Sequence, residues 1–258
     1  MLVQQTLDKL EGMGLAGMAQ AMRQQMEQSQ YLELSFEERL GMLVDRESEM
    51  REDRRLQLRL KAARLRQSVS VEEIDFRAPR GLDRSLVLSL AQATWVEAHH
   101  NLLITGPTGC GKSFVACALA QAAIRRGHTA LYVRAPRLLA DLQLARGDGR
   151  YPRLLTQLAK VRLLLLDDFL IVPAQGDEAR DLLEVIDDRS QLRSTMVVSQ
   201  LPVERWHPAL ADLTLADAIM DRLVHNAHRI ALKGESMRRR QPSIDEAPVT
   251  KPGPPAGV

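Results

Sequence analysis

The sequence is poor in aromatic residues and in cysteine, and it has no long apolar run. Aromatic residues make up 3% of its 258 residues, so leucine and alanine must supply most of the core, which favours helices over an all-β fold. Its two cysteines, Cys110 and Cys117, lack metal-ligand neighbours and are typical of a reducing compartment. No stretch approaches the roughly 20 apolar residues that span a bilayer. These absences predict a cytoplasmic protein that does not associate with a membrane.

The first 70 residues are predicted to form a small, all-helical domain. Glycines between Gly12 and Gly17 interrupt a helical spacing of apolar residues, which indicates a helical hairpin. Ser35 followed by Glu38 is a capping-box pattern, and it predicts one long helix that extends to about Gln67.

Basic residues gather on one side of this long helix. The formal net charge of the chain is only +2, so DNA binding has to be argued from such local clusters. We call the following residues the basic ridge and take them as candidates for DNA phosphate contacts: Arg51, Arg54, Arg55, Arg59, Lys61 and Arg66. No aromatic residue for base stacking accompanies them, which favours duplex over single-stranded DNA. Ordinary surface ion pairs with nearby acids, such as Glu47 and Glu52, would explain the ridge equally well.

From residue 71 to about 240, strands and helices are expected to alternate. Such alternation predicts a central parallel sheet flanked by helices. The expected strands are Asn101–Thr105, Ala130–Arg134, Val161–Asp167 and Thr195–Ser199, and helices are expected between and after them. Residues 241–258 contain five prolines and no apolar periodicity, which predicts a disordered tail.

A glycine-rich loop lies between the first of these strands and the helix that follows it. Gly106–Ser113 matches the P-loop pattern G-x-x-x-x-G-K-[ST] in the strand-to-helix context that the motif requires. Its backbone N–H groups are expected to bind phosphate, Lys112 to neutralise the β and γ phosphates, and Ser113 to ligate Mg²⁺. The candidate ATP-binding residues are Gly106, Pro107, Thr108, Gly109, Cys110, Gly111, Lys112, Ser113 and Phe114.

Two acids end an uninterrupted apolar strand. Because the carboxyl end of a buried parallel strand faces the phosphates, Asp167 is a candidate Mg²⁺ ligand and Asp168 a candidate for polarising the attacking water. Capping of the next helix is the alternative. Ser199 and Gln200 end the next expected strand, where a polar group could reach the γ-phosphate or simply form a turn. Arg222 could equally be a surface arginine paired with Asp217 or Asp221.

Residues 34–240 resemble the IstB-like helper ATPases of insertion-sequence transposition, which are related to DnaC-type helicase loaders within the AAA+ class. The resemblance rests on several motifs, which are Leu34-Ser35-Phe36-Glu37-Glu38-Arg39-Leu40, Arg80-Gly81-Leu82-Asp83, Asn101–Gly109, Ser199–Val203, Ala216–Asn226 and Lys233–Arg238. It implies an AAA+ ATPase that uses ATP and Mg²⁺, assembles as a homo-oligomer on duplex DNA, and assists a cognate transposase in target selection.

The same resemblance assigns roles to individual residues. It implies that Gln200, or alternatively Ser199, is a sensor of the γ-phosphate, that Arg222 is an arginine finger for a neighbouring subunit, and that Arg238 is a second sensor. Two departures bear on turnover: Leu170 stands where relatives commonly have glycine, and Asp168 is shorter than the usual glutamate. Asp168 therefore leaves an ATP-gated DNA-binding scaffold with negligible hydrolysis as an alternative. A helicase loader, which would bind single strands and a helicase rather than a transposase, is a second alternative.

Overall fold

The computed structural model describes residues 2–234 and 236–237 and divides the chain into two compact units. The first unit ends at Ala62 and the second begins at Ala63, whereas the sequence places the boundary after residue 70. The expected tail from residue 241 and the candidate Arg238 lie outside the described residues. No helix of the described part of the chain is long and apolar enough to cross a membrane.

The first unit is helical, as the sequence predicts. It comprises α1 (Leu2–Gly12), α2 (Ala16–Glu27), the 3₁₀ turn η1 (Ser29–Glu33) and α3 (Phe36–Ala63). The capping box at the start of α3 is confirmed, because the Glu38 backbone N–H donates to Ser35 Oγ over 3.2 Å and the Ser35 N–H donates to the Glu38 carboxylate over 2.8 Å. The expectation that this helix reaches Gln67 is wrong. It ends at Ala63, and Arg64 then turns the chain with a φ of 51°.

Helices α2 and α3 approach each other closely at Gly17. A Cβ on Gly17 would lie 2.7 Å from the Glu47 Cα, so no larger residue fits there. The Glu47 carboxylate accepts hydrogen bonds from the Gly17 N–H over 2.7 Å and from Arg51 Nε over 2.7 Å. One member of the basic ridge therefore takes part in the kind of local ion pair that offers an alternative explanation for the ridge.

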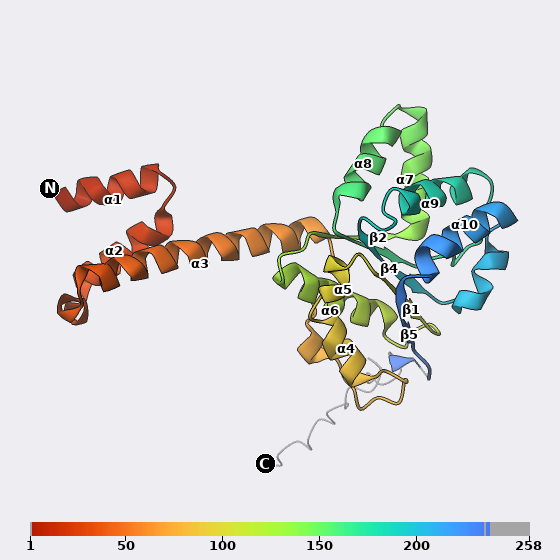
Figure 1. Ribbon diagram of the computed structural model, residues 1–258, viewed down its shortest axis with the longest axis horizontal. Helices are drawn as coiled ribbons and strands as arrows, with labels where there is room; N and C mark the ends of the chain where they lie inside the picture. Colours follow the sequence, from red (N-terminus) through yellow and green to blue (C-terminus); the bar gives the residue numbers. More distant parts are fainter. Residues whose placement is uncertain (1, 235, 238–258) are drawn as a thin grey trace, which may run out of the picture. The chain divides into compact units, whose positions relative to one another are not determined.

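The second unit is built on a parallel sheet of five strands in the order β2-β3-β4-β1-β5. The strands are β1 (Asn101–Thr105), β2 (Ala130–Arg134), β3 (Leu163–Asp167), β4 (Ser194–Ser199) and β5 (Ala227–Ala231). The helices and 3₁₀ turns are η2 (Val71–Glu73), α4 (Arg84–Leu90), α5 (Thr94–Glu97), α6 (Lys112–Arg125), α7 (Ala135–Gly147), α8 (Tyr151–Lys160), α9 (Asp177–Asp187), η3 (Val203–Arg205), η4 (His207–Ala209) and α10 (Leu213–Val224). Figure 1 shows helices on both faces of this sheet, which confirms the predicted fold class.

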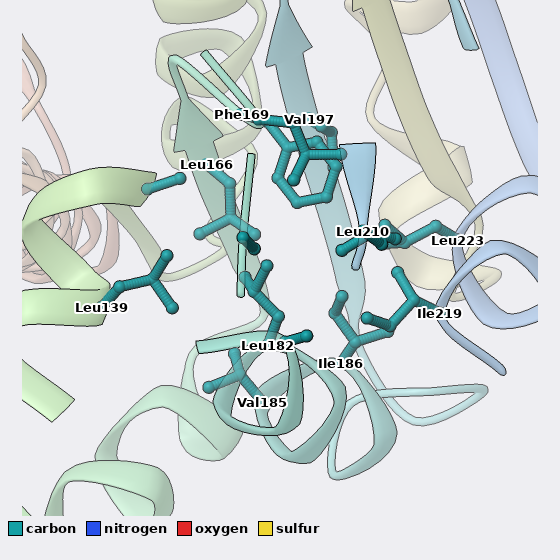
Figure 2. Packing of buried hydrophobic residues seen from close by; sticks show 14 of the residues in the cluster. Leu139, Leu166, Phe169, Leu182, Val185, Ile186, Val197, Leu210, Ile219 and Leu223 are labelled. Carbon is teal, nitrogen blue, oxygen red and sulfur yellow. The ribbon is translucent and has the colours of Figure 1, made fainter. Parts of the chain in front are cut away.

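The two faces of the sheet are buried by different helices. Helix α6 packs against β1, β3 and β4 on one face. On the other face, Leu166 and Val197 join side chains from α7, α9 and α10 in one apolar cluster, including Leu182 and Ile219 (Figure 2). Because alternate residues of a strand point to opposite faces, β3 can be apolar throughout only if it is buried on both sides. All five of its residues are buried.

The strand β5 was not predicted from the sequence. The sequence predicts no strand after Ser199, but β5 follows α10 and pairs in parallel with β1. It lies at the edge of the sheet, and Ile230 is its only buried residue. An edge strand that carries His228 and Arg229 shows neither the apolar run nor the clean alternation by which strands are recognised.

Candidate nucleotide-binding site

The P-loop connects β1 to α6, as predicted. Its glycines are required by their surroundings: Gly106 and Gly111 have φ values of 146° and 90°. An added Cβ would collide with the Leu232 carbonyl oxygen at Gly106 and with the Arg80 guanidinium at Gly111. At Gly106 the obstacle is backbone, so only a residue without a side chain fits there, whereas at Gly111 it is the positive φ that favours glycine.

The start of α6 provides positive charge at the loop. Among the described residues, no side-chain hydrogen bond caps this end of the helix, and the N-terminus of a helix favours an anion through its backbone N–H groups. Lys112 is only 8% exposed, and its Nζ donates to the Pro107 carbonyl over 2.7 Å. Burial lowers the pKa of Lys112, while nearby Asp167 and Asp168 oppose this. An anionic ligand would supply the counter-charge that a buried ammonium needs.

The loop borders two cavities. A cavity of about 270 Å³ is lined by Arg66, Gln67, Gly109, Gly111, Lys112, Ser113, Phe114 and Met237. A smaller one of about 70 Å³ is lined by Arg66, Thr108, Gly109, Lys112, Ser113, Asp167, Asp168, Val198, Ser199 and Gln200. The second cavity joins the P-loop to the ends of β3 and β4, so the structure brings the predicted phosphate-binding, acidic and sensor residues together.

Asp167 is buried at the end of β3 and engaged on both carboxylate oxygens. Its Oδ1 accepts from Ser113 Oγ over 3.1 Å, and its Oδ2 accepts from the Tyr132 hydroxyl over 2.8 Å. Burial and this bond to a carboxylate raise the pKa of Tyr132, so its proton stays in place. Arg66 Nη1 lies 3.9 Å from the same Oδ2. Sequence analysis missed Tyr132, because nothing local in the sequence shows that its strand, β2, lies beside β3.

A hydroxyl and a carboxylate side by side suit Mg²⁺. Both are oxygen ligands of the kind that Mg²⁺ prefers, and Mg²⁺ is usually shared between one or two protein ligands and the phosphates. Within residues 2–234 and 236–237 no group of three or more His, Cys, Asp or Glu side chains could hold a metal by itself. Ser113 and Asp167 therefore fit a metal that arrives with the nucleotide.

Asp168 stands beside this pair in an unusual conformation. Its φ is 55°, a left-handed value that costs free energy in a residue other than glycine. Its Oδ2 accepts a hydrogen bond from Arg134 Nε over 2.7 Å. Arg134 ends β2, the strand next to β3, and sequence analysis missed it. In this structure the candidate water-polarising acid is ion-paired.

The end of β4 separates the two sensor candidates. Ser199 is buried, and its hydroxyl donates to the Phe169 carbonyl over 2.8 Å and accepts from the Leu201 N–H over 3.1 Å. Gln200 instead reaches the P-loop, where its Oε1 accepts from Thr108 Oγ1 over 2.7 Å. Only Gln200 has its polar end directed at the nucleotide loop.

Arg222 lies far from the P-loop of its own chain. The Asn101 amide donates to the Arg222 carbonyl over 2.9 Å, which places this residue at the amino end of β1. The P-loop follows the opposite end of the same strand, about 13 Å further along. The Arg222 guanidinium pairs with Asp187 over 2.5 Å and is 31% exposed. The alternative interpretation of Arg222 paired it with Asp217 or Asp221, and that partner is wrong: the structure pairs it with Asp187 of α9.

Five of the six residues of the basic ridge lie on α3, and Arg66 does not. Arg51, Arg54, Arg55 and Lys61 are exposed on α3, and Arg59 is half-buried there. Arg66 is not on the helix, since α3 ends at Ala63. It lines both cavities of the nucleotide site instead. Projection of Arg66 onto an ideal helix misplaced it because the chain turns at Arg64.

Comparison with known proteins identifies the family. The family model described as "IstB-like ATP binding protein" matches residues 8–244. The chain belongs to this family. It is therefore an ATP-binding protein of a family associated with insertion sequences, which confirms the resemblance read from the sequence.

Individual relatives agree with this assignment. The insertion sequence ATP-binding protein y4pL of Sinorhizobium fredii is 51% identical over 241 residues, covering 93% of this chain and 98% of the relative. The insertion sequence IS21 ATP-binding protein of Pseudomonas aeruginosa is 35% identical, covering 84% and 82%. Among solved structures, DnaI superimposes with a TM-score of 0.55 at 22% identity, covering 65% of this chain and 92% of DnaI. The last similarity supports the fold of this IstB-like protein.

Proposed function

We propose that this IstB-like protein hydrolyses ATP with Mg²⁺, assembles as a homo-oligomer on duplex DNA, and assists a transposase in selecting its target. The observation that carries the proposal is the convergence of Lys112, Ser113 and Asp167 around one cavity in a chain whose relatives are named for insertion sequences. A phosphate-binding loop, a pair of Mg²⁺ ligands and a second acid are the parts that phosphoryl transfer to water requires.

Each residue of the site would have its own part in ATP hydrolysis. Lys112 and the backbone of the P-loop bind phosphate oxygens, and Ser113 and Asp167 would hold Mg²⁺, which neutralises charge on the transferred phosphate. Asp168 orients the attacking water, and Gln200, held at the loop by Thr108, contacts the terminal phosphate. For Asp168 to act, its carboxylate has to leave Arg134.

Arg222 would act on a neighbouring subunit. Its place at the amino end of β1 keeps it away from its own nucleotide, while its guanidinium is partly exposed and held by a single acid, Asp187. An arginine supplied from outside stabilises transition-state charge. Repeated head-to-tail contacts, in which one surface of a subunit meets a different surface of the next, bring such a residue to every site.

A mixing experiment tests this assembly. Arg222→Ala keeps its own P-loop but offers no finger, and Lys112→Ala offers the finger but binds no nucleotide. Each variant alone should be nearly inactive, whereas an equal mixture should recover about a quarter of wild-type hydrolysis, because half of the subunits keep a P-loop and half of their neighbours keep Arg222. Co-assembly without recovery would show that Arg222 does not act in trans.

Duplex DNA and the transposase are the proposed partners of the protein. The exposed residues of α3 in the basic ridge support contact with DNA phosphates, which carries little sequence information. Hydrolysis should therefore rise when duplex DNA of any sequence is added, and further when the transposase of the same element is present. No response to either one would contradict the role in transposition while leaving ATP binding intact.

One observation favours the scaffold alternative. Because Arg134 occupies the Asp168 carboxylate, the protein could bind ATP and assemble on DNA without measurable turnover. ATP-dependent DNA binding with no hydrolysis at any DNA or transposase concentration would support this reading. The helicase-loader alternative has support only from distant fold similarity to proteins such as the DnaC helicase loader, at 17% identity and a TM-score of 0.50, and stimulation by single-stranded rather than duplex DNA would favour it.

A further inference from the structure

Arg66 reaches the nucleotide site from a segment outside the sheet. The chain leaves α3 at Ala63, which is fully buried, and turns at Arg64 with its φ of 51°. Arg66 then lines both cavities of the site. Its position belongs to the same compact unit as the P-loop, so the contacts of Arg66 with the site lie within one unit.

In the part of the chain that the structure describes, the guanidinium of Arg66 has one acidic neighbour, Asp167, and the pair is loose. Its Nη1 lies 3.9 Å from Asp167 Oδ2, an oxygen that already accepts the Tyr132 hydroxyl. The Asp167 side chain is 1% exposed, whereas that of Arg66 is 47% exposed. The acid is therefore fixed, and the arginine has room to change partner.

Binding of Mg²⁺ would force that change. A metal ion on Asp167 and the Arg66 guanidinium are both cations, and at the edge of a buried site they repel each other strongly. Phosphate oxygens supply a new acceptor, which the planar guanidinium can bind through two N–H groups. The smaller cavity joins Arg66 to Lys112, Asp168 and Gln200, the residues expected around the terminal phosphate.

We propose that Arg66 binds the terminal phosphate of the ATP held in its own subunit, and that it pairs with Asp167 when no nucleotide is present. This inference rests on the proposed nucleotide site and replaces the expectation that Arg66 contacts DNA. It adds a cation from the same chain to the one that Arg222 supplies from a neighbour. Arg66 thereby distinguishes ATP from ADP before any hydrolysis occurs.

The test compares nucleotide affinity in four variants by the fluorescence of methylanthraniloyl-labelled ATP and ADP with Mg²⁺. Arg66→Ala should weaken ATP binding about tenfold and ADP binding much less, since a hydrogen bond to a charged group is lost only with ATP. Arg66→Lys should keep part of the affinity because it keeps the charge. Arg77→Ala is the matched control, because it removes the same charge from an exposed residue of the same unit that lines neither cavity, and it should bind both nucleotides like the wild type.

The fourth variant separates this inference from the site assignment itself. If Lys112→Ala binds ATP as well as the wild type does, the P-loop assignment fails, and the Arg66 inference fails with it. If Lys112→Ala loses ATP while Arg66→Ala binds it normally, or loses ATP and ADP equally, only the Arg66 inference is overturned. Duplex DNA affinity without nucleotide should be the same for Arg66→Ala and the wild type, and a selective loss of it would restore the DNA role.

Discussion

Removal of one hydroxyl, in Tyr132→Phe, should both destabilise the protein and weaken its use of Mg²⁺. The hydroxyl donates to the Asp167 carboxylate over 2.8 Å, and Asp167 is 1% exposed, so the phenyl ring of the variant leaves that oxygen without its donor. A hydrogen bond to a charged group contributes about 1.5–3 kcal/mol. Because Ser113 still donates to Oδ1 and Arg66 lies near Oδ2, we expect a loss of about 1.5–2 kcal/mol, near the lower end of that range.

The melting temperature gives the first readout. For a domain of this size about 1 kcal/mol corresponds to about 2–4 °C, so the melting temperature should fall by about 3–8 °C. The second readout is the Mg²⁺ concentration needed for half-maximal ATP binding. It should rise about tenfold or more, because a residue that orients a metal ligand contributes to metal affinity on that scale.

A second tyrosine provides the matched control. The Tyr151 hydroxyl donates to Asp181 over 2.7 Å, and Asp181 is completely buried among α7, α8 and α9. Tyr151→Phe removes the same group from the same kind of acceptor, away from the P-loop. It should lower the melting temperature without changing the Mg²⁺ requirement. Equal Mg²⁺ requirements in both variants and the wild type would refute the assignment of Asp167 as the metal ligand.

Three further predictions concern turnover, DNA and pH. Asp168→Asn should bind ATP normally but hydrolyse it at least about a hundredfold more slowly, and retained turnover would remove Asp168 from the mechanism. Replacing Arg54 and Arg55 together with alanine should reduce the slope of log affinity for duplex DNA against log salt by about 1.8; an unchanged slope would mean that these residues do not contact phosphate. Burial and His100, whose ring centroid lies 5.5 Å away, lower the pKa of His228 in the folded protein. The imidazole of His228 therefore binds a proton more tightly in the unfolded chain than in the folded one. Stability should therefore fall as the pH drops below about 6.5, and His228→Gln should show a smaller fall in its chemical-denaturation midpoint.

The P-loop after β1 and the two acids after β3 could be found from the sequence because each pattern depends on neighbouring residues. The P-loop lies within one short segment, and the apolar run before Asp167 shows that its strand is buried on both faces. The partners of these residues come from elsewhere in the chain. Tyr132 and Arg134 reach the acids only because β2 lies beside β3, and no local pattern specifies that neighbour.

Arg66 illustrates a different limit. A helical projection assumes that the helix continues, and the apolar and basic pattern gives no sign of the stop at Ala63. The helix ends where Arg64 adopts a left-handed conformation. A glycine at this position would have predicted the end of the helix, but an arginine does not. The left-handed conformation of Arg64 thus places Arg66 beside the P-loop instead of on the exposed side of α3.

The order of the strands bears on the proposal that Arg222 acts on a neighbouring subunit. Because β4 lies between β3 and β1, Gln200 at its carboxyl end lies between the acids after β3 and the P-loop after β1. All the strands are parallel, so every residue that follows a strand arrives at this edge, and every residue that precedes one lies at the opposite edge. Arg222 precedes β5 and contacts the first residue of β1, so it belongs to the opposite edge. An arginine in that position can meet a nucleotide only if the opposite edge of one subunit faces the nucleotide edge of the next, which makes the mixing experiment a test of the assembly as well as of the residue.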